Sequence, residues 1–265
     1  MKSTVHSVVS ALALAVASVS LTPDAGAQDS SKQLFELRVY NLKSKEKAEI
    51  FDRTVKDAYL PALKRAGVGP VGVFRKKDAG EGDPEIRYMV IPYDSADGML
   101  KLKKMLESDA EFASAAADYL SAGKGGEIVD RIESTLLLGF DGMPKLKLPG
   151  AAGDTPNRYF ELRKYESLSE MKGILKVQMF NKAELAIFAK VGLDGVFFGQ
   201  ALVGADLPQL TYMLVYDDEA AKEAAWKGFL EHPDWLVLKE DQTYKDTVSK
   251  IVSTFLLAMD YSQVK

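Results

Sequence analysis

Two short segments of the chain carry the same set of polar side chains, and these could bind or convert a ligand. Residues 34–40 (LFELRVY) and residues 159–165 (YFELRKY) lie 125 positions apart and share five of their seven residues. An arginine can receive an anionic group, and a tyrosine or a glutamate can transfer a proton. The recurring polar residues are Glu36, Arg38 and Tyr40 in the first segment, and Glu161, Arg163 and Tyr165 in the second.

The order of apolar and polar residues predicts that both segments are β-strands. The two kinds of residue alternate with a period of two, which separates the two faces of a strand. Phe35, Leu37 and Val39 then share one face, and the polar residues share the other. Neighbours on one face stand about 7 Å apart, so a glutamate and an arginine there can interact directly or through water.

Two interpretations of this polar set stay open. In the first, the side chains line a cavity that receives a ligand; in the second, glutamate and arginine neutralise one another while the tyrosine buries its ring. Identical sets in both segments favour the structural interpretation, because one asymmetric active site would not need them twice. With two tyrosines from a repeated Tyr-Met pair, the candidate ligand-binding residues are Glu36, Arg38, Tyr40, Tyr88, Glu161, Arg163, Tyr165 and Tyr212. No catalytic residue is assigned.

The composition argues against metal and cofactor chemistry. The chain has no cysteine, and His232 is the only histidine outside the N-terminal residues. Multi-histidine zinc sites, thiolate sites and cysteine nucleophiles are therefore excluded. Because His232 precedes Pro233, we predict a helix break there, with Asp234 capping the next turn. We expect no metal and no cofactor, haem included.

The elements around the two segments follow one order twice. After the first strand, the sequence predicts a helix over 44–65 with a kink at Pro61, a hairpin of strands 71–74 and 86–91, a helical region over 95–119 interrupted near Ser108-Asp109, and a strand over 132–138. The second copy keeps this βαββαβ order at offsets that shrink from 125 to 119. Tyr88-Met89 aligns with Tyr212-Met213 at an offset of 124. Such sustained similarity indicates a tandem duplication.

This order predicts an α+β fold made of two ferredoxin-like repeats. Each sheet has one bare face, so we expect the two sheets to cover each other as a fused, pseudo-dimeric α/β barrel. Two separate domains are the alternative, but the apolar runs at 136–138 and 255–257 are typical of strands covered on both faces. The expected boundaries are 28–140 for the first repeat, 141–157 for a linker and 158–265 for the second repeat.

These features resemble the NIPSNAP family. The resemblance rests on the F-E-L-R-x-Y strand, the glycine after the first helix (Gly67 and Gly192), the Tyr-Met strand and the segment His232-Pro233-Asp234-Trp235. The second copy is closer to the family pattern, since Ala110 and Phe112 replace Pro and Trp in the first. The resemblance implies a dimeric α/β-barrel fold, and it brings no catalytic residues.

The N-terminus predicts a secretory signal peptide over residues 1–27. Lys2 gives a positive start, residues 8–16 an apolar run, and Ala25-Gly26-Ala27 a cleavage site. We therefore expect a secreted or periplasmic protein without stable membrane insertion after processing. The net charge of −4 offers no basic surface for nucleic acid. A monomeric pseudo-dimer or a homodimer is expected.

Three classes of function fit these observations. We favour a barrel whose cavity binds a small anionic or hydrophobic molecule. A cofactor-independent enzyme resembling a monooxygenase or an isomerase is the alternative, and a secreted structural or interaction module is the third. The sequence leaves open whether the site lies in the barrel lumen or between helices and sheet.

Overall fold

Eight antiparallel strands close into a single barrel. The structure, a computed structural model, describes residues 32–150 and 157–265. Around the barrel the strands follow the order β1-β3-β2-β8-β5-β7-β6-β4. Their bounds are β1 (Leu34–Leu42), β2 (Gly72–Lys76), β3 (Glu85–Tyr93), β4 (Val129–Gly139), β5 (Tyr159–Glu166), β6 (Asp194–Val203), β7 (Gln209–Tyr216) and β8 (Lys250–Ala258).

The two repeats share this barrel. β2 pairs with β8 and β4 pairs with β6, so each seam joins one strand from each repeat. The predicted fused barrel is therefore confirmed, and the alternative of two separate sheets is wrong. Pairing across both seams closes the sheet of the described residues, so each of its strands has a neighbour on both sides.

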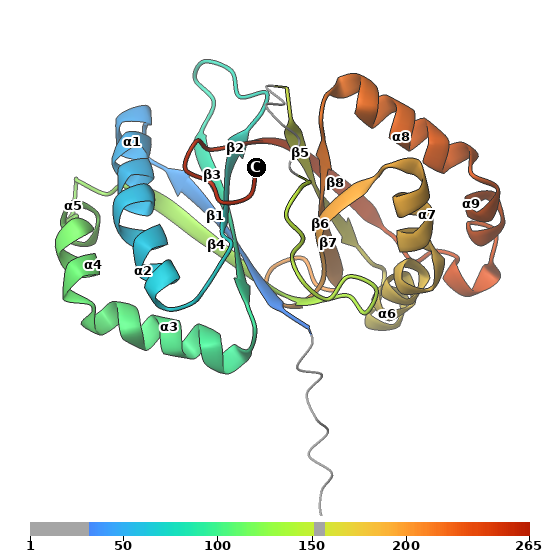
Figure 1. Ribbon diagram of the computed structural model, residues 1–265, viewed down its shortest axis with the longest axis horizontal. Helices are drawn as coiled ribbons and strands as arrows, with labels where there is room; N and C mark the ends of the chain where they lie inside the picture. The colour runs from blue at the N-terminus through green and yellow to red at the C-terminus, as the bar shows by residue number, and fades with distance from the viewer. Residues whose placement is uncertain (1–31, 151–156) are drawn as a thin grey trace, which may run out of the picture.

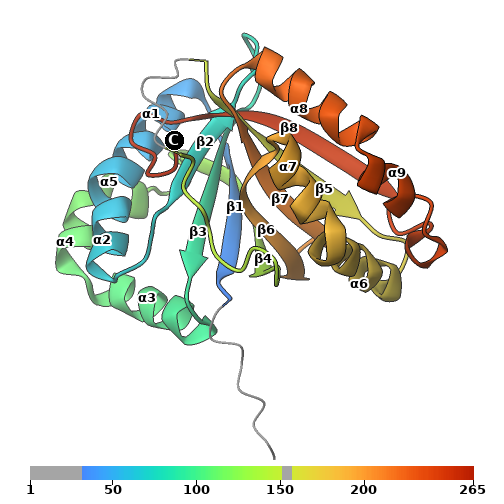
Figure 2. The same ribbon diagram turned by 45° about the vertical axis from the view of Figure 1, so that its right-hand side comes forward.

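Helices cover the outside of the barrel on two opposite sides (Figures 1 and 2). Those of the first repeat are α1 (Lys45–Thr54), η1 (Val55–Tyr59), α2 (Leu60–Arg65), α3 (Ala96–Ser108), α4 (Ala110–Ala115) and α5 (Ala117–Leu120). Those of the second are α6 (Glu170–Met179), η2 (Phe180–Glu184), α7 (Leu185–Val191), α8 (Glu219–Glu231), α9 (Pro233–Leu238) and the short η3 (Gln242–Tyr244). Both repeats thus have the predicted βαββαβ order.

The first long helix of each repeat widens into one π-helical turn at the same place. In the first repeat this turn, η1, ends at Tyr59, and Leu60 and Pro61 follow in the first turn of α2. In the second repeat η2 ends at Glu184, directly before Leu185, and Ala186 occupies the position that corresponds to Pro61. Because the π turn persists without proline, proline does not cause it. π turns often occur beside functional sites.

The second helical region is interrupted in both repeats, as predicted. Asp109 caps α4 by accepting a hydrogen bond from the Phe112 amide (2.9 Å). In the second repeat His232 itself is the cap, because its Nδ1 accepts from the Asp234 amide (3.2 Å). The prediction that Asp234 caps this turn is therefore wrong. The only histidine of the described chain serves a helix end.

The barrel interior is filled by apolar side chains from all eight strands. Phe35 and Phe197 lie 5.2 Å apart between ring centroids, and Phe74 and Phe160 lie 4.9 Å apart. Leu37 belongs to the same cluster, which confirms that the apolar face of the first strand points inward. The interior of the barrel is therefore an apolar core.

The polar set therefore lies on the outer face of the sheet, beneath the helices. Alternation along a strand puts Glu36, Arg38 and Tyr40 opposite the inward residues. Tyr40 packs with the helices of the first repeat and Tyr165 with those of the second. The polar residues that the sequence singled out on β1 and β5 therefore face the helices and not the barrel lumen.

One prediction concerns N-terminal residues that lie outside the described part of the chain. The predicted signal peptide, residues 1–27, precedes the described residues and stays a prediction. Within residues 32–150 and 157–265, no helix is long and apolar enough to cross a membrane.

Candidate functional site

Glu36 and Arg38 form a two-pronged ion pair on the outer face of β1. Arg38 Nε donates to Glu36 Oε1 (2.6 Å), and Arg38 Nη2 donates to Glu36 Oε2 (3.0 Å). The two residues are neighbours on one face of the strand, which brings the side chains together without help from another element. The planar guanidinium matches the two carboxylate oxygens, and such paired bonds fix its orientation.

Two hydroxyl groups complete the surroundings of the Glu36 carboxylate. Tyr93 on β3 donates to Oε2, and Ser134 on β4 donates to Oε1, each at 2.9 Å. Burial pushes the pKa of Glu36 upward, but Arg38 and the two hydroxyls outweigh it and hold the pKa below its usual value. Glu36 is therefore a carboxylate, and its oxygens are already used by the protein.

The third nitrogen of Arg38 holds two phenol groups. Nη1 donates to the hydroxyl of Tyr59 (3.0 Å) and to that of Tyr40 (3.3 Å). Tyr59 is the last residue of the π turn η1, so the widened helix brings it over the sheet. Burial raises the pKa of Tyr59 to about 12, and burial also raises the pKa of Tyr40. Both phenols are therefore protonated at neutral pH.

Each of these phenols keeps a hydrogen to donate. A hydroxyl that accepts from a guanidinium can still donate its own proton. Among the described residues, neither the Tyr40 nor the Tyr59 hydroxyl donates a hydrogen bond to another group. Two O–H donors therefore converge on one region next to Arg38, where an acceptor oxygen would fit.

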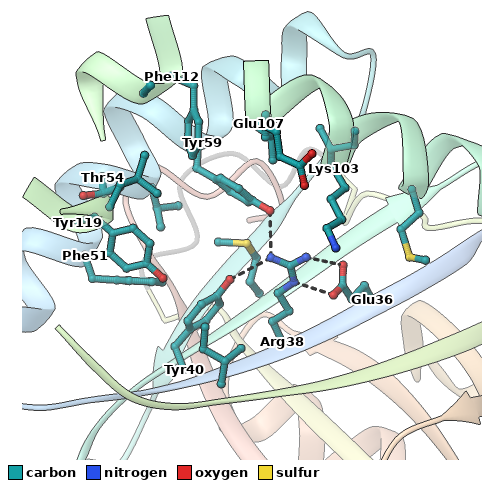
Figure 3. Close-up of a pocket in the computed structure, with 18 of the residues that line it drawn as sticks. Glu36, Arg38, Tyr40, Phe51, Thr54, Tyr59, Lys103, Glu107, Phe112 and Tyr119 are labelled. Carbon is teal, nitrogen blue, oxygen red and sulfur yellow. Dashed lines mark hydrogen bonds and ion pairs between the residues drawn. The ribbon is translucent and has the colours of Figure 1, made fainter. Parts of the chain in front are cut away.

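A cavity of about 710 Å³ opens at this place between the helices and the sheet of the first repeat. Figure 3 shows the Arg38 cluster at one side of it, with Phe51, Phe112 and Tyr119 along the walls. Lys103 and Glu107, both exposed, lie on α3 at its edge. The other lining residues are Thr54, Val55, Met89, Tyr93, Met99, Leu100, Leu102, Leu106, Ala113, Leu120 and Ile132.

The second repeat contains the same polar framework. Arg163 Nη1 donates to Glu161 Oε1 (2.5 Å), and Glu161 also accepts from Tyr216 (2.6 Å) and Ser253 (2.5 Å). Arg163 Nη2 donates to the Tyr165 hydroxyl (3.2 Å). Burial raises the pKa of Glu161, yet Arg163 and the two hydroxyls lower it further than burial raises it.

Aromatic side chains fill the space above this second framework. The Trp226 ring centroid lies 4.6 Å from Arg163 Cζ, and the Trp226 Nε1 donates to the Tyr216 hydroxyl (2.8 Å). Tyr165 and Tyr212 share a hydrogen bond of 2.8 Å in the buried core. A hollow of about 490 Å³ remains between α8 and the sheet. Glu161 and Arg163 border this hollow, and no residue of α6, η2 or α9 borders it.

The matching helices show which substitution opens the first repeat. α3 and α8 each have 13 residues, and Ser95 and Asp218 cap them in the same way. Counting from these caps, Lys103 occupies the position of Trp226. In the same alignment Leu106 stands for Phe229. A flexible lysine and a smaller apolar residue thus replace two of the rings that fill the second repeat.

The predicted site residues have different fates in the structure. Glu36, Arg38 and Tyr40 line the cavity, and Glu161 and Arg163 border the smaller hollow. Tyr165 and Tyr212 lie in the core of the second repeat. No single site contains all eight residues, because the two repeats lie on opposite sides of the barrel (Figure 1).

The placement of Tyr88 corrects the predicted alignment. Tyr88 pairs with Val39 and belongs to the barrel interior, whereas Tyr212 pairs with Arg163 and faces the helices. Arg38 pairs with Met89, so Met89 is the counterpart of Tyr212. The repeated Tyr-Met pair predicted an offset of 124 between the repeats, but the pairing of the strands shows that the offset here is one residue smaller. A shift of one residue moves a side chain to the other face.

The sequence interpretation missed several members of the framework. Tyr93 and Tyr216 recur at the true offset of strand 3, and Ser134 and Ser253 recur in the last strand. Their repetition could have marked them, because each adds a hydroxyl to the same carboxylate. Tyr59 has no such signal, since Glu184 takes its place in the second repeat.

The described residues contain no group of three or more histidine, aspartate or glutamate side chains placed to hold a metal ion. The polar groups that the cavity offers include two phenol donors, a paired arginine, a paired carboxylate and a lysine at the edge.

Comparison with known proteins gives a family match and a fold. The model of the NIPSNAP family matches residues 157–263, which is the second repeat. This is the copy that contains His232-Pro233-Asp234-Trp235, the segment closer to the family pattern. No curated protein matches the chain.

Three solved structures illustrate the similarity. A proposed monooxygenase from Lactobacillus acidophilus has a TM-score of 0.55 at 11% identity, over 86% of this chain and 94% of its own. A proposed monooxygenase from Fusobacterium nucleatum has a TM-score of 0.52 at 10% identity, over 86% and 92%. An uncharacterised NIPSNAP-like domain protein from Burkholderia xenovorans has a TM-score of 0.36 at 19% identity, over 40% and 89%. Residues 157–263 therefore resemble the NIPSNAP family, and the chain as a whole has the α/β-barrel fold built from two ferredoxin-like halves.

Proposed function

We propose that the cavity of the first repeat binds a small, mostly apolar molecule that carries an acceptor oxygen. The observation that carries this proposal is the pair of phenol donors, Tyr40 and Tyr59, held by one nitrogen of Arg38. Neither hydroxyl donates to a described residue, and both tyrosines line the cavity. A carbonyl, phenolate or carboxylate oxygen of a ligand would accept both.

The size and lining of the cavity support a ligand of drug-like dimensions. Ligand sites generally measure about 300–1,000 Å³ and have mostly apolar walls with a few placed polar groups. The cavity here is about 710 Å³, and Phe51, Phe112 and Leu106 are typical of its walls. Most of the binding free energy would then come from burial of apolar surface.

The charges around the cavity favour a neutral or singly anionic ligand. Glu36 and Arg38 neutralise one another, so they contribute little net charge. Lys103 has no ion-pair partner within 4 Å among the described residues, and it lies at the edge of the cavity. An anionic substituent that reaches the edge would meet this ammonium group.

A second candidate function is an enzyme that uses the same cavity. Two O–H donors aimed at one place can stabilise negative charge that develops on an oxygen during a reaction. The fold is shared with proteins described as monooxygenases, but similarity at this identity concerns fold and carries no activity. Turnover of a bound molecule, measured by mass spectrometry of the mixture, would distinguish an enzyme from a binding protein.

A fragment screen with two tryptophan variants tests the proposal. Ligand-observed NMR would compare the wild type with Lys103→Trp, which places the ring of the second repeat in the first cavity. Lys104→Trp is the matched control, because Lys104 is exposed on the same helix and does not line the cavity. We expect apolar, oxygen-bearing fragments to bind the wild type and the control and to lose binding to Lys103→Trp. Equal binding to all three proteins would refute the proposal.

A further inference from the structure

We infer that the ligand of the first repeat contains a flat aromatic ring with a ring N–H, which stacks on Arg38 and donates to Tyr93. Trp226 makes both of these contacts in the second repeat, and the first repeat keeps the receiving groups without the indole. This inference rests on the proposed function and narrows it to a ligand class.

The second repeat shows the arrangement in full. The Trp226 ring lies 4.6 Å from the Arg163 guanidinium, a distance at which a cation is attracted to the face of an indole. Its Nε1 donates to the Tyr216 hydroxyl, and that hydroxyl donates to Glu161. An N–H donor, a phenol and a carboxylate thus form a chain beside the arginine.

The first repeat contains every member of this chain except the donor. Tyr93 donates to Glu36 (2.9 Å), as Tyr216 does to Glu161. The tyrosine oxygen can still accept a hydrogen bond, and no described residue donates to it. Lys103 stands where Trp226 would be, so the space above Arg38 is open toward the cavity.

The exposure of the two arginines agrees with a missing ring. The Arg38 side chain is 28% exposed, whereas the Arg163 side chain beneath Trp226 is 16% exposed. A flat ring fits this place better than an aliphatic chain, because only a π face attracts the guanidinium. A ring N–H fits better than a ring oxygen, because the Tyr93 proton is already committed to Glu36.

The first test compares indole with benzofuran, which has a similar shape but an oxygen in place of the N–H. Titration calorimetry on the wild-type protein should give a dissociation constant for indole about fivefold lower, the discrimination expected of one hydrogen bond. Tyr93→Phe should remove this preference while both compounds still bind. Equal affinity of indole and benzofuran for the wild type would overturn the inference.

The second test moves the ring between the repeats. Trp226→Ala should raise the stoichiometry of indole from one to two, because it frees the face of Arg163. Lys103→Trp should reduce the stoichiometry from one to zero. Trp235→Ala is the matched control: Trp235 packs on Phe229 at 4.4 Å and is not among the residues that border Arg163, so the stoichiometry should stay at one. Lys103→Trp decides by itself whether or not Trp226→Ala folds, and unchanged indole binding to Lys103→Trp would overturn the inference.

The outcomes separate this inference from the proposed function. If aliphatic oxygen compounds bind the wild type and lose binding to Lys103→Trp, but indole does not bind, the ligand class is wrong and the binding function stands. If neither group of compounds is sensitive to Lys103→Trp, both the function and the ligand class are wrong.

Discussion

The guanidinium of Arg163 lies 4.6 Å from the ring of Trp226, whereas Arg38, its counterpart, borders an open cavity. The two repeats therefore contain the same polar framework, covered by a tryptophan ring in the second repeat and bordering a cavity in the first. In the second repeat, Trp226 covers the arginine and a hollow of about 490 Å³ remains beside it. In the first, the arginine borders a cavity of about 710 Å³.

The first prediction concerns the ion pairs themselves. Glu161 is 2% exposed, so Arg163→Met leaves a buried carboxylate without its cation and should lower the free energy of unfolding by about 3–5 kcal/mol. Adding Glu161→Gln should restore part of this loss, because the uncompensated charge is removed. Urea denaturation of the two single variants and the double variant measures the coupling.

The same cycle on Arg38 and Glu36 is the matched comparison. We expect a smaller loss there, because the cavity lets water reach the Glu36 carboxylate. Nearly neutral and additive effects in the second repeat would contradict the structural role that we assign to its ion pair.

A second prediction concerns an ion pair that the first repeat lacks. Lys176 Nζ lies 2.8 Å from Glu184 Oε2, and both residues are buried. Phe51 and Tyr59 occupy the equivalent positions in the first repeat. Lys176→Met should lower the free energy of unfolding by about 3–5 kcal/mol, whereas the double change Lys176→Met with Glu184→Leu should be neutral or stabilising. Thermal melts of the three proteins would decide, and a double variant less stable than the single one would contradict us.

The barrel could be predicted from the sequence because the same strand and helix pattern occurs in both copies. Alternation in 34–40 assigned Phe35 to one face and Glu36 to the other, and the second copy excluded chance. The cavity was beyond reach, since it depends on how close the helices lie to the sheet. Whether Lys103 leaves a space that Trp226 fills is a matter of packing, and no local pattern encodes it.

The register of the strands explains why the predicted alignment of Tyr88 with Tyr212 was wrong. Tyr88-Met89 and Tyr212-Met213 are identical pairs, yet they are one residue out of step in the sheet. Hydrogen bonds to β1 and β5 set the register, and these follow from the whole strand. The better guide was Tyr93 with Tyr216, because both donate to the glutamate of their repeat.

A third prediction follows from the lowered pKa of Glu161. A carboxyl whose pKa is lower in the folded state stabilises the fold at pH values above its unfolded pKa, which is about 4.3. This stabilisation is lost as the pH falls through the folded pKa. The stability difference between the wild type and Glu161→Gln should therefore be constant from pH 7 to about 5 and shrink toward pH 3. Urea midpoints across this range measure it, and a difference that grows on acidification would be evidence against the assignment.

The shared barrel gives a fourth prediction. In a fragment of residues 28–150, β2 loses β8 and β4 loses β6, so two strand edges and the apolar inner face become exposed. We expect this fragment to dimerise or aggregate, because self-association is the simplest way to cover them. Light scattering after size-exclusion chromatography would report its mass. A stable monomer would mean that the repeats fold independently.

The most direct test of the ligand-binding cavity is mass spectrometry of small molecules retained by the native protein after gentle purification. The wild type, Lys103→Trp and the control Lys104→Trp would be denatured and their released compounds compared. We expect a compound with an aromatic ring and an acceptor oxygen, bound to the wild type and the control in near-stoichiometric amounts and absent from Lys103→Trp. The same compound retained in equal amount by Lys103→Trp would contradict ligand binding in the first cavity.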